Sequence, residues 1–146
     1  MTISAPVATG FRLDGQARWA DMDPNSHMKN TAFLDYAADA RMRFFQSHGF
    51  APERFAQLQL GPIALKDTIE YRREIRLYES FTVTLTATMA KADGSRFTLF
   101  NTFTREDGSL AARVETQGAW FDQARRKITA PPPDLLALIQ QLNESE

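Results

Sequence analysis

The segment over residues 31–46 constrains the fold more than any other part of the chain, because its apolar residues recur at helical spacing. Its apolar surface is wider than a single stripe and comprises Phe33, Leu34, Tyr36, Ala37, Ala38, Ala40, Met42, Phe44 and Phe45. A helix with so wide an apolar surface needs other structure to cover it. We therefore predict a helix over 31–46 that ends near Gly49 and lies inside the protein.

The pattern changes from helical to strand-like after Gly61 and Pro62, which we interpret as a break in the chain. Residues 69–77 and 81–89 alternate between apolar and polar side chains, as half-buried strands do. Two hairpin turn signals follow, Asp93-Gly94 and Asp107-Gly108, with a run of strand formers between them and a long strand at about 110–122 after them. This half of the chain predicts a meander of antiparallel strands with one apolar face.

The remaining segments complete an α+β fold. We expect a loose lead-in over about residues 1–10, a short strand within 11–20, a short helix over 52–59, and a C-terminal helix over about 134–143 that Asp134 caps. A single apolar helix buries its surface only if a sheet curves around it. The prediction is one domain, residues 1–146, in which a curved antiparallel sheet of about five strands wraps a long central helix.

The composition excludes several classes of function. The formal net charge is −1, so no overall field attracts nucleic acid or an anionic membrane, and we expect neither as a partner. The absence of cysteine excludes disulfides and thiol catalysis, and it fits a cytoplasmic protein. No apolar stretch approaches the roughly 20 residues that cross a bilayer, and the first ten residues do not resemble a signal peptide.

Common metal and nucleotide motifs are also missing. The two histidines, His27 and His48, do not have the spacing of metal ligands, and neither a P-loop nor a G-x-S-x-G turn is present. We therefore predict no metal and no cofactor. His48 follows the predicted helix end, where a cation suits the helix dipole, and we interpret it as structural.

The chemistry is concentrated in residues 21–30, DMDPNSHMKN. Asp23, Asn25 and His27 alternate in one loop just before the long helix, where first-turn N–H groups can hold an oxyanion. A carboxylate can activate water or attack, an amide can orient either reactant, and an imidazole titrates near pH 6.5 and can move a proton. The alternative is structural: Asp23 and Asn25 are common turn residues, and His27 can simply pack at the helix entry. Asp21, at the strand end, is interpreted as structural.

The segment WADMDPNSHMKNTAFLDYAADAR resembles the opening of the hotdog-fold acyl-CoA thioesterases of the 4-hydroxybenzoyl-CoA thioesterase superfamily. Their typical opening is an acidic loop with D-x-x-G-H-V-N-N, then Y-L-x-Y and a helix ending in A-R. The resemblance is close over residues 18–45 and looser to about residue 125. It implies a helix enclosed by a sheet, a homodimer or homotetramer, and a catalytic carboxylate at Asp23, as nucleophile or general base.

The spacing of Asp23, Asn25 and His27 is also similar to that of plant acyl-carrier-protein thioesterases, in which all three residue types belong to the site. Ser26 stands where many bacterial relatives have glycine, which restricts the loop backbone. Lys29 stands where many have the first of two asparagines, so Asn30 remains as a possible cap and substrate contact.

Coenzyme A carries phosphates, so basic groups are expected at the mouth of the pocket. Lys91 and Arg96 flank the Asp93-Gly94 turn and are the candidates, with Arg72 and Arg73 as others, although for each of them taken alone a solvated strand charge is the favoured interpretation. The resemblance implies a cofactor-free acyl-CoA thioesterase. Alternatives are an acyl-carrier-protein thioesterase, a hotdog protein that binds acyl thioesters without hydrolysing them, and a hydratase on the same fold. Acyl length, acyl type and carrier stay open.

Overall fold

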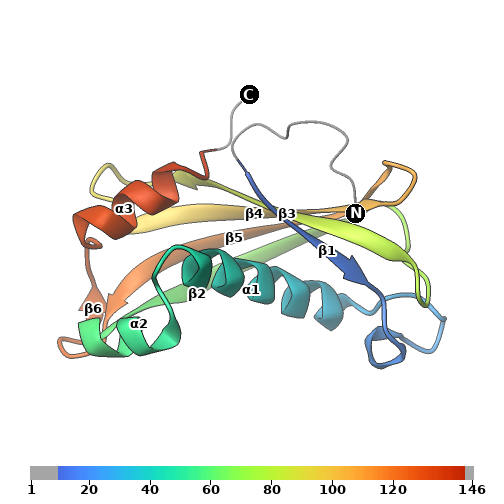
Figure 1. Ribbon diagram of the computed structural model, residues 1–146, viewed down its shortest axis with the longest axis horizontal. Coiled ribbons are helices and arrows are strands. Elements are labelled where there is room, and N and C mark those ends of the chain that lie inside the picture. Colours follow the sequence, from blue (N-terminus) through green and yellow to red (C-terminus); the bar gives the residue numbers. More distant parts are fainter. Residues whose placement is uncertain (1–9, 144–146) are drawn as a thin grey trace.

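A computed structural model describes residues 10–143 of the protein. Its centre is the helix α1, Asn30–Ser47, which lies along the inner face of a curved antiparallel sheet (Figure 1). The predicted α+β architecture, with a long helix wrapped by a curled sheet, is confirmed. The expected lead-in over residues 1–10 lies outside the described residues, apart from Gly10.

The sheet has the strand order β1-β3-β4-β5-β2, so its two outer strands are β1 and β2. The long strands are β1 Phe11–Gln16, β2 Leu60–Tyr71, β3 Ser80–Met89, β4 Arg96–Arg105 and β5 Leu110–Asp122, and the short β6, Lys127–Ile128, pairs with β5. Strands β3, β4 and β5 follow one another through tight turns, with Gly94 and Gly108 at positive φ in the two hairpins that the sequence predicted. All the pairings between the named strands are antiparallel.

The core forms between α1 and the alternating positions of the sheet. On the helix, Phe33, Ala37 and Phe44 are buried, and on β3 every second residue from Phe81 to Ala87 is buried. Burying one such phenylalanine is worth about 1.5–3 kcal/mol relative to leaving it exposed. Burial of the wide apolar surface of α1 is therefore what holds the helix in the curve of the sheet.

Strand β2 differs from the strand that the sequence predicted. It begins at Leu60, contains Gly61 and Pro62, and ends at Tyr71, whereas the alternation had suggested a strand over 69–77 after a break. Proline is tolerated because β2 is an outer strand, where one row of N–H groups has no ladder partner. The chain then leaves the sheet, and Ile75 accepts the Met28 N–H with an N···O distance of 2.7 Å, which brings this segment against the loop before α1.

Within residues 10–143, two shorter helices and a turn of 3₁₀ helix accompany α1 and the sheet. They are η1 Trp19–Asp21, α2 Pro52–Leu58 and α3 Pro133–Gln140. The strand predicted within 11–20 therefore ends at Gln16, and the C-terminal helix ends three residues before the expected Asn143. Asp134 lies in the first turn of α3 and not at its cap, and its carboxylate pairs with Arg54 at 2.7 Å.

Candidate active site

The loop between η1 and α1 is anchored by the carboxylate of Asp21, which is 3% exposed. Arg18 donates to it from its backbone N–H and its guanidinium, both at 2.9 Å, and the Tyr36 hydroxyl donates at 2.6 Å. Burial raises the pKa of Asp21, but the hydrogen bonds from Arg18 and Tyr36 outweigh it, so the pKa lies below its ordinary value. Asp21 therefore fixes the entry to the loop as an ionised group, consistent with the structural role expected for it.

Asp23 holds the loop in shape through one of its carboxylate oxygens. Its Oδ1 accepts the backbone N–H groups of Asn25 and His27, at 2.8 Å and 3.1 Å. The Asp23 backbone N–H donates to the His27 carbonyl at 2.8 Å, and the Asp23 carbonyl accepts the Ser26 N–H at 3.0 Å. Asp23 therefore does organise the loop, which is the structural role given above as the alternative to catalysis. Within residues 10–143 the second oxygen, Oδ2, accepts no hydrogen bond.

Ser26 adopts the left-handed backbone conformation, with φ of 64°. This is the position where many hotdog relatives have glycine, and the left-handed conformation costs the serine roughly 1 kcal/mol. The turn therefore forms in this chain without the glycine. Asn25 and Asn30 are exposed, and Lys29, not Asn30, is the residue that precedes the first helical residue.

The side chain of His27 turns to Glu74, not to Asp23. Its Nε2 lies 3.1 Å from Glu74 Oε2, and Arg76 donates to Glu74 Oε1 at 2.8 Å. The hydrogen bond from Arg76 and the charge of His27 lower the pKa of Glu74, so this carboxylate stays ionised beside the imidazole. Asp23 and His27 are thus joined by hydrogen bonds that involve backbone atoms of His27. The imidazole of His27 is oriented instead by Glu74, which the sequence did not single out.

A cavity of about 210 Å³ opens beside His27. Its walls comprise His27, Met28, Phe33, Tyr71, Arg72, Arg73 and Glu74. The lining combines apolar side chains with the carboxylate of Glu74 and two arginines, which the sequence named only as secondary candidates for the phosphates of CoA. The arrangement can place an uncharged group against Phe33 and an anion against Arg72 or Arg73.

Lys91 and Arg96 lie at the other end of the sheet within one chain. The segment that leads into the loop contacts the start of β3, where the Ala17 N–H donates to the Glu79 carbonyl at 2.9 Å, whereas Lys91 and Arg96 flank the hairpin after the end of that strand (Figure 1). A strand of this length separates them by roughly 30 Å. They can reach the loop only from another subunit, so their role in binding stays a prediction.

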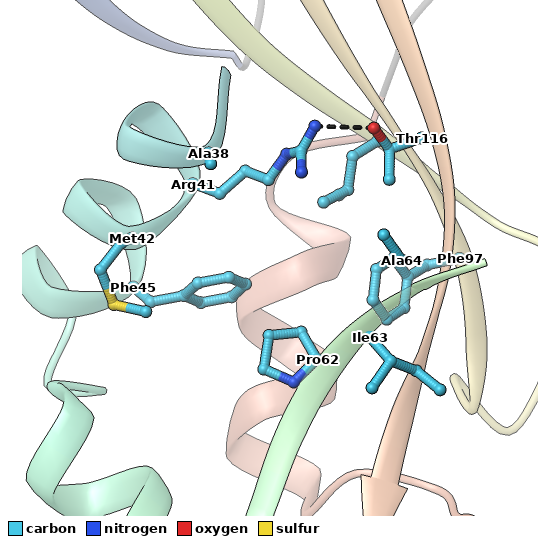
Figure 2. Close-up of a pocket in the computed structure, with 10 residues that line it drawn as sticks. Ala38, Arg41, Met42, Phe45, Pro62, Ile63, Ala64, Phe97 and Thr116 are labelled. Atoms are coloured by element: carbon cyan, nitrogen blue, oxygen red, sulfur yellow. Dashed lines mark hydrogen bonds between the residues drawn. The ribbon is translucent and has the colours of Figure 1, made fainter. Parts of the chain in front are cut away.

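A second cavity, of about 250 Å³, lies between α1 and the start of β2 (Figure 2). Arg41 enters it from the helix, and its Nη2 donates to Thr116 on β5 at 2.6 Å. The buried Asn101 on β4 accepts from the same guanidinium at 3.4 Å. Sequence reasoning missed this cluster, although a polar residue at an inward position of a strand, as Asn101 is, was a usable signal.

The residues that the structure describes contain no cluster of three or more histidine, aspartate or glutamate side chains suited to a metal ion. Over the same range, 10–143, each helix is too short or too polar to cross a membrane.

The helix, the sheet and the acidic loop together define a hotdog-fold protein of the thioesterase type. The sequence profile of the thioesterase-like superfamily matches residues 17–139, which is most of the chain. The chain therefore belongs to this superfamily, and the thioesterase family predicted from the sequence is confirmed.

Solved structures agree in fold. A hypothetical protein from Staphylococcus aureus, solved in complex with CoA, is 26% identical with a TM-score of 0.84, covering 99% of this chain and 92% of its own. A 1,4-dihydroxy-2-naphthoyl-CoA thioesterase from Synechocystis is 20% identical with a TM-score of 0.82, covering 93% and 99%. A gentisyl-coenzyme A thioesterase is 12% identical with a TM-score of 0.75, covering 87% and 98%. Curated protein sequences gave no significant match.

Proposed function

We propose that the protein hydrolyses an acyl-CoA thioester to the free acid and CoA, without a cofactor. The observation that carries the proposal is the loop of a thioesterase-superfamily chain in which one Asp23 carboxylate oxygen accepts two backbone N–H groups and the other accepts no hydrogen bond within residues 10–143. The similarity to a solved relative in complex with CoA supports coenzyme A as the carrier. Arg72 and Arg73 line the His27 cavity, and arginine side chains commonly bind phosphates such as those of coenzyme A.

The proposed chemistry uses Asp23 as general base or nucleophile. As a base, Asp23 takes a proton from water while the water oxygen adds to the thioester carbonyl, and the proton passes to sulfur as the C–S bond breaks. As a nucleophile, Asp23 displaces the thiolate and water then cleaves the mixed anhydride. Asn25 and His27 position the reactants, and N–H groups of the loop or of the first turn of α1 hold the oxyanion.

A substrate panel tests the proposal. We expect thiol release, followed with a thiol-detecting dye, from one or more aliphatic or aromatic acyl-CoA substrates. Parallel assays with acyl-carrier-protein thioesters decide the carrier, and an enoyl-CoA assay at the absorbance of the double bond tests the hydratase alternative. Tight binding of acyl-CoA by calorimetry with no thiol released from any substrate would instead establish a non-hydrolytic binding protein.

We also propose that the active form is a homodimer, or a tetramer of such dimers, joined through β2. This outer strand is twelve residues long, and it exposes Leu65 (49%) and Tyr71 (53%). A long unpaired edge with apolar side chains favours pairing with a second copy, and a two-fold axis makes that pairing antiparallel. The Pro62–Ala64 end of one β2 then approaches the Tyr71 end of the other, so the α1/β2 cavity of one subunit adjoins the His27 cavity of its partner.

Sedimentation of the wild-type chain measures this assembly. We expect a dimer or tetramer at micromolar concentration, and a shift towards monomer in Leu65→Lys, which places a charge on the exposed edge without touching the core. Tyr78→Lys, at an exposed position just before β3 and on the far side of the sheet from β2, is the matched control and leaves the assembly unchanged. A wild-type monomer at all concentrations contradicts the proposal.

A further inference from the structure

The cavity between α1 and β2 has apolar walls and a cation. Most of its lining is apolar, from Ala38, Met42, Phe45, Pro62, Ile63, Ala64, Phe97 and Leu99. Figure 2 shows the Arg41 guanidinium beside the open space between Phe45, Pro62 and Phe97, with its one dashed contact to Thr116. A hydrocarbon chain fits the walls, and an acceptor oxygen fits the cation.

The charge of Arg41 is not neutralised by a direct ion pair. Within residues 10–143 no carboxylate lies at ion-pair distance from it. The Thr116 hydroxyl, which accepts from Arg41, donates in turn to the exposed carboxylate of Asp67. The charge of Asp67 therefore acts on Arg41 across the threonine. Burial lowers the pKa of Arg41, and the charge of Asp67 opposes this only in part.

The guanidinium also has unused donors. Its Nη2 is bound by Thr116, and the Nε and Nη2 contacts to Asn101 are both 3.4 Å long, at the weak limit of a hydrogen bond. Over the part of the chain that the structure describes, Nη1 has no hydrogen-bond partner. A half-buried guanidinium with free N–H groups in an apolar cavity is suited to a planar carboxylate, which accepts two such donors at once.

We infer that this cavity is the acyl subsite and that Arg41 selects acyl groups bearing a carboxylate at the end remote from the thioester. The inference rests on the proposed function and names its substrate class. At about 30 Å³ for each water-sized group, the volume of about 250 Å³ takes roughly eight heavy atoms. That is the size of a dicarboxylic half-thioester of four to six carbons. In the proposed dimer, the thioester lies where this cavity meets the partner's loop.

Adipyl-CoA and hexanoyl-CoA are the matched probes, because their acyl chains have equal carbon number and differ in the terminal carboxylate. We expect wild type to favour adipyl-CoA in kcat/KM. Arg41→Met, which keeps the length and removes the donors, lowers kcat/KM for adipyl-CoA by about 10- to 100-fold and leaves or raises that for hexanoyl-CoA. Arg41→Lys keeps the charge without the planar fork and retains part of the preference.

Thr116→Val is a second variant that keeps the shape of a buried residue and removes the acceptor of Arg41. We expect it to reduce the adipyl preference to an intermediate value with hexanoyl-CoA unaffected. Equal loss for both substrates in Arg41→Met and Thr116→Val, or no wild-type preference, overturns the inference while thioesterase activity stands. Calorimetry covers the case in which the subsite is correct but the protein does not hydrolyse thioesters. Preferential binding of adipyl-CoA that is lost in Arg41→Met, without hydrolysis, supports the subsite and rejects the proposed function.

Discussion

Asp23→Asn is expected to reduce kcat for acyl-CoA hydrolysis by about 10²- to 10⁴-fold, the range of a lost general base. The substitution isolates the charge from the architecture. An asparagine side-chain oxygen still accepts the two backbone N–H groups, from Asn25 and His27, that Oδ1 accepts in the wild type. The loop therefore keeps its shape, and only the proton acceptor or nucleophile is removed.

Two further variants interpret the result. Asp23→Ala removes the charge and both backbone hydrogen bonds, and it is expected to lower kcat at least as far and to reduce thermal stability as well. Asp14→Asn, an exposed carboxylate on β1, is the matched control and keeps the wild-type rate. Full activity in Asp23→Asn, with a loss only in Asp23→Ala, would mean that Asp23 organises the loop and takes no part in the chemistry.

The fold was predictable because the two halves of the chain carry two different periods. The apolar recurrence over 31–46 became α1 with one residue added at each end, and the alternation over 81–89 became β3. Strand β2 was misplaced because its residues are mostly exposed, so burial left no clear alternation at its start. Gly61 and Pro62 looked like a break for the same reason: nothing in the local sequence says that a strand will be the outer one.

The position of the candidate loop was predictable from the sequence, and the partners of its side chains were not. Asp23 and His27 stand in one loop, so their proximity follows from the chain itself. The contact of His27 with Glu74 depends on how the segment after β2 crosses the loop, which is tertiary information. The alternation that placed Glu74 in a strand assigned it to a sheet face, whereas the chain there leaves the sheet. Arg41 entered only as a polar interruption of the apolar helix and as the last residue of the family-like segment, and no contact of its side chain followed from either.

Lys91 and Arg96 show a further limit of local reasoning. They were chosen because basic residues beside a turn suit a phosphate, and the turn did form where predicted. Their distance from the loop is set by the length of β3, which separates the two ends of the sheet. A ligand that spans subunits can still meet them, but the geometry of such an assembly is encoded in surface complementarity, which one chain's pattern does not reveal.

Trp120 is the largest fully buried side chain, and it packs in the part of the core that lies near α2 and the C-terminal half of α1. It is 0% exposed on β5, and its ring lies 5.7 Å, 5.9 Å and 5.3 Å from the centroids of Phe45, Phe55 and Phe97. These rings come from α1, α2 and β4, so a single side chain joins two helices to the sheet. Within residues 10–143 its indole Nε1–H has no hydrogen-bond partner.

Trp120→Ala is expected to lower the free energy of unfolding by about 3–5 kcal/mol, because it removes the ring and leaves a cavity among three aromatic neighbours. Trp120→Phe keeps an aromatic ring there and removes a buried, unpaired N–H whose desolvation costs about 1–3 kcal/mol. The lost packing and the relieved N–H oppose each other, so we expect a loss below about 2 kcal/mol for phenylalanine. Urea unfolding of the three proteins at one concentration measures both differences. Equal losses in the two variants would mean that neither the phenyl ring nor the removal of the unpaired N–H stabilises the native state relative to alanine.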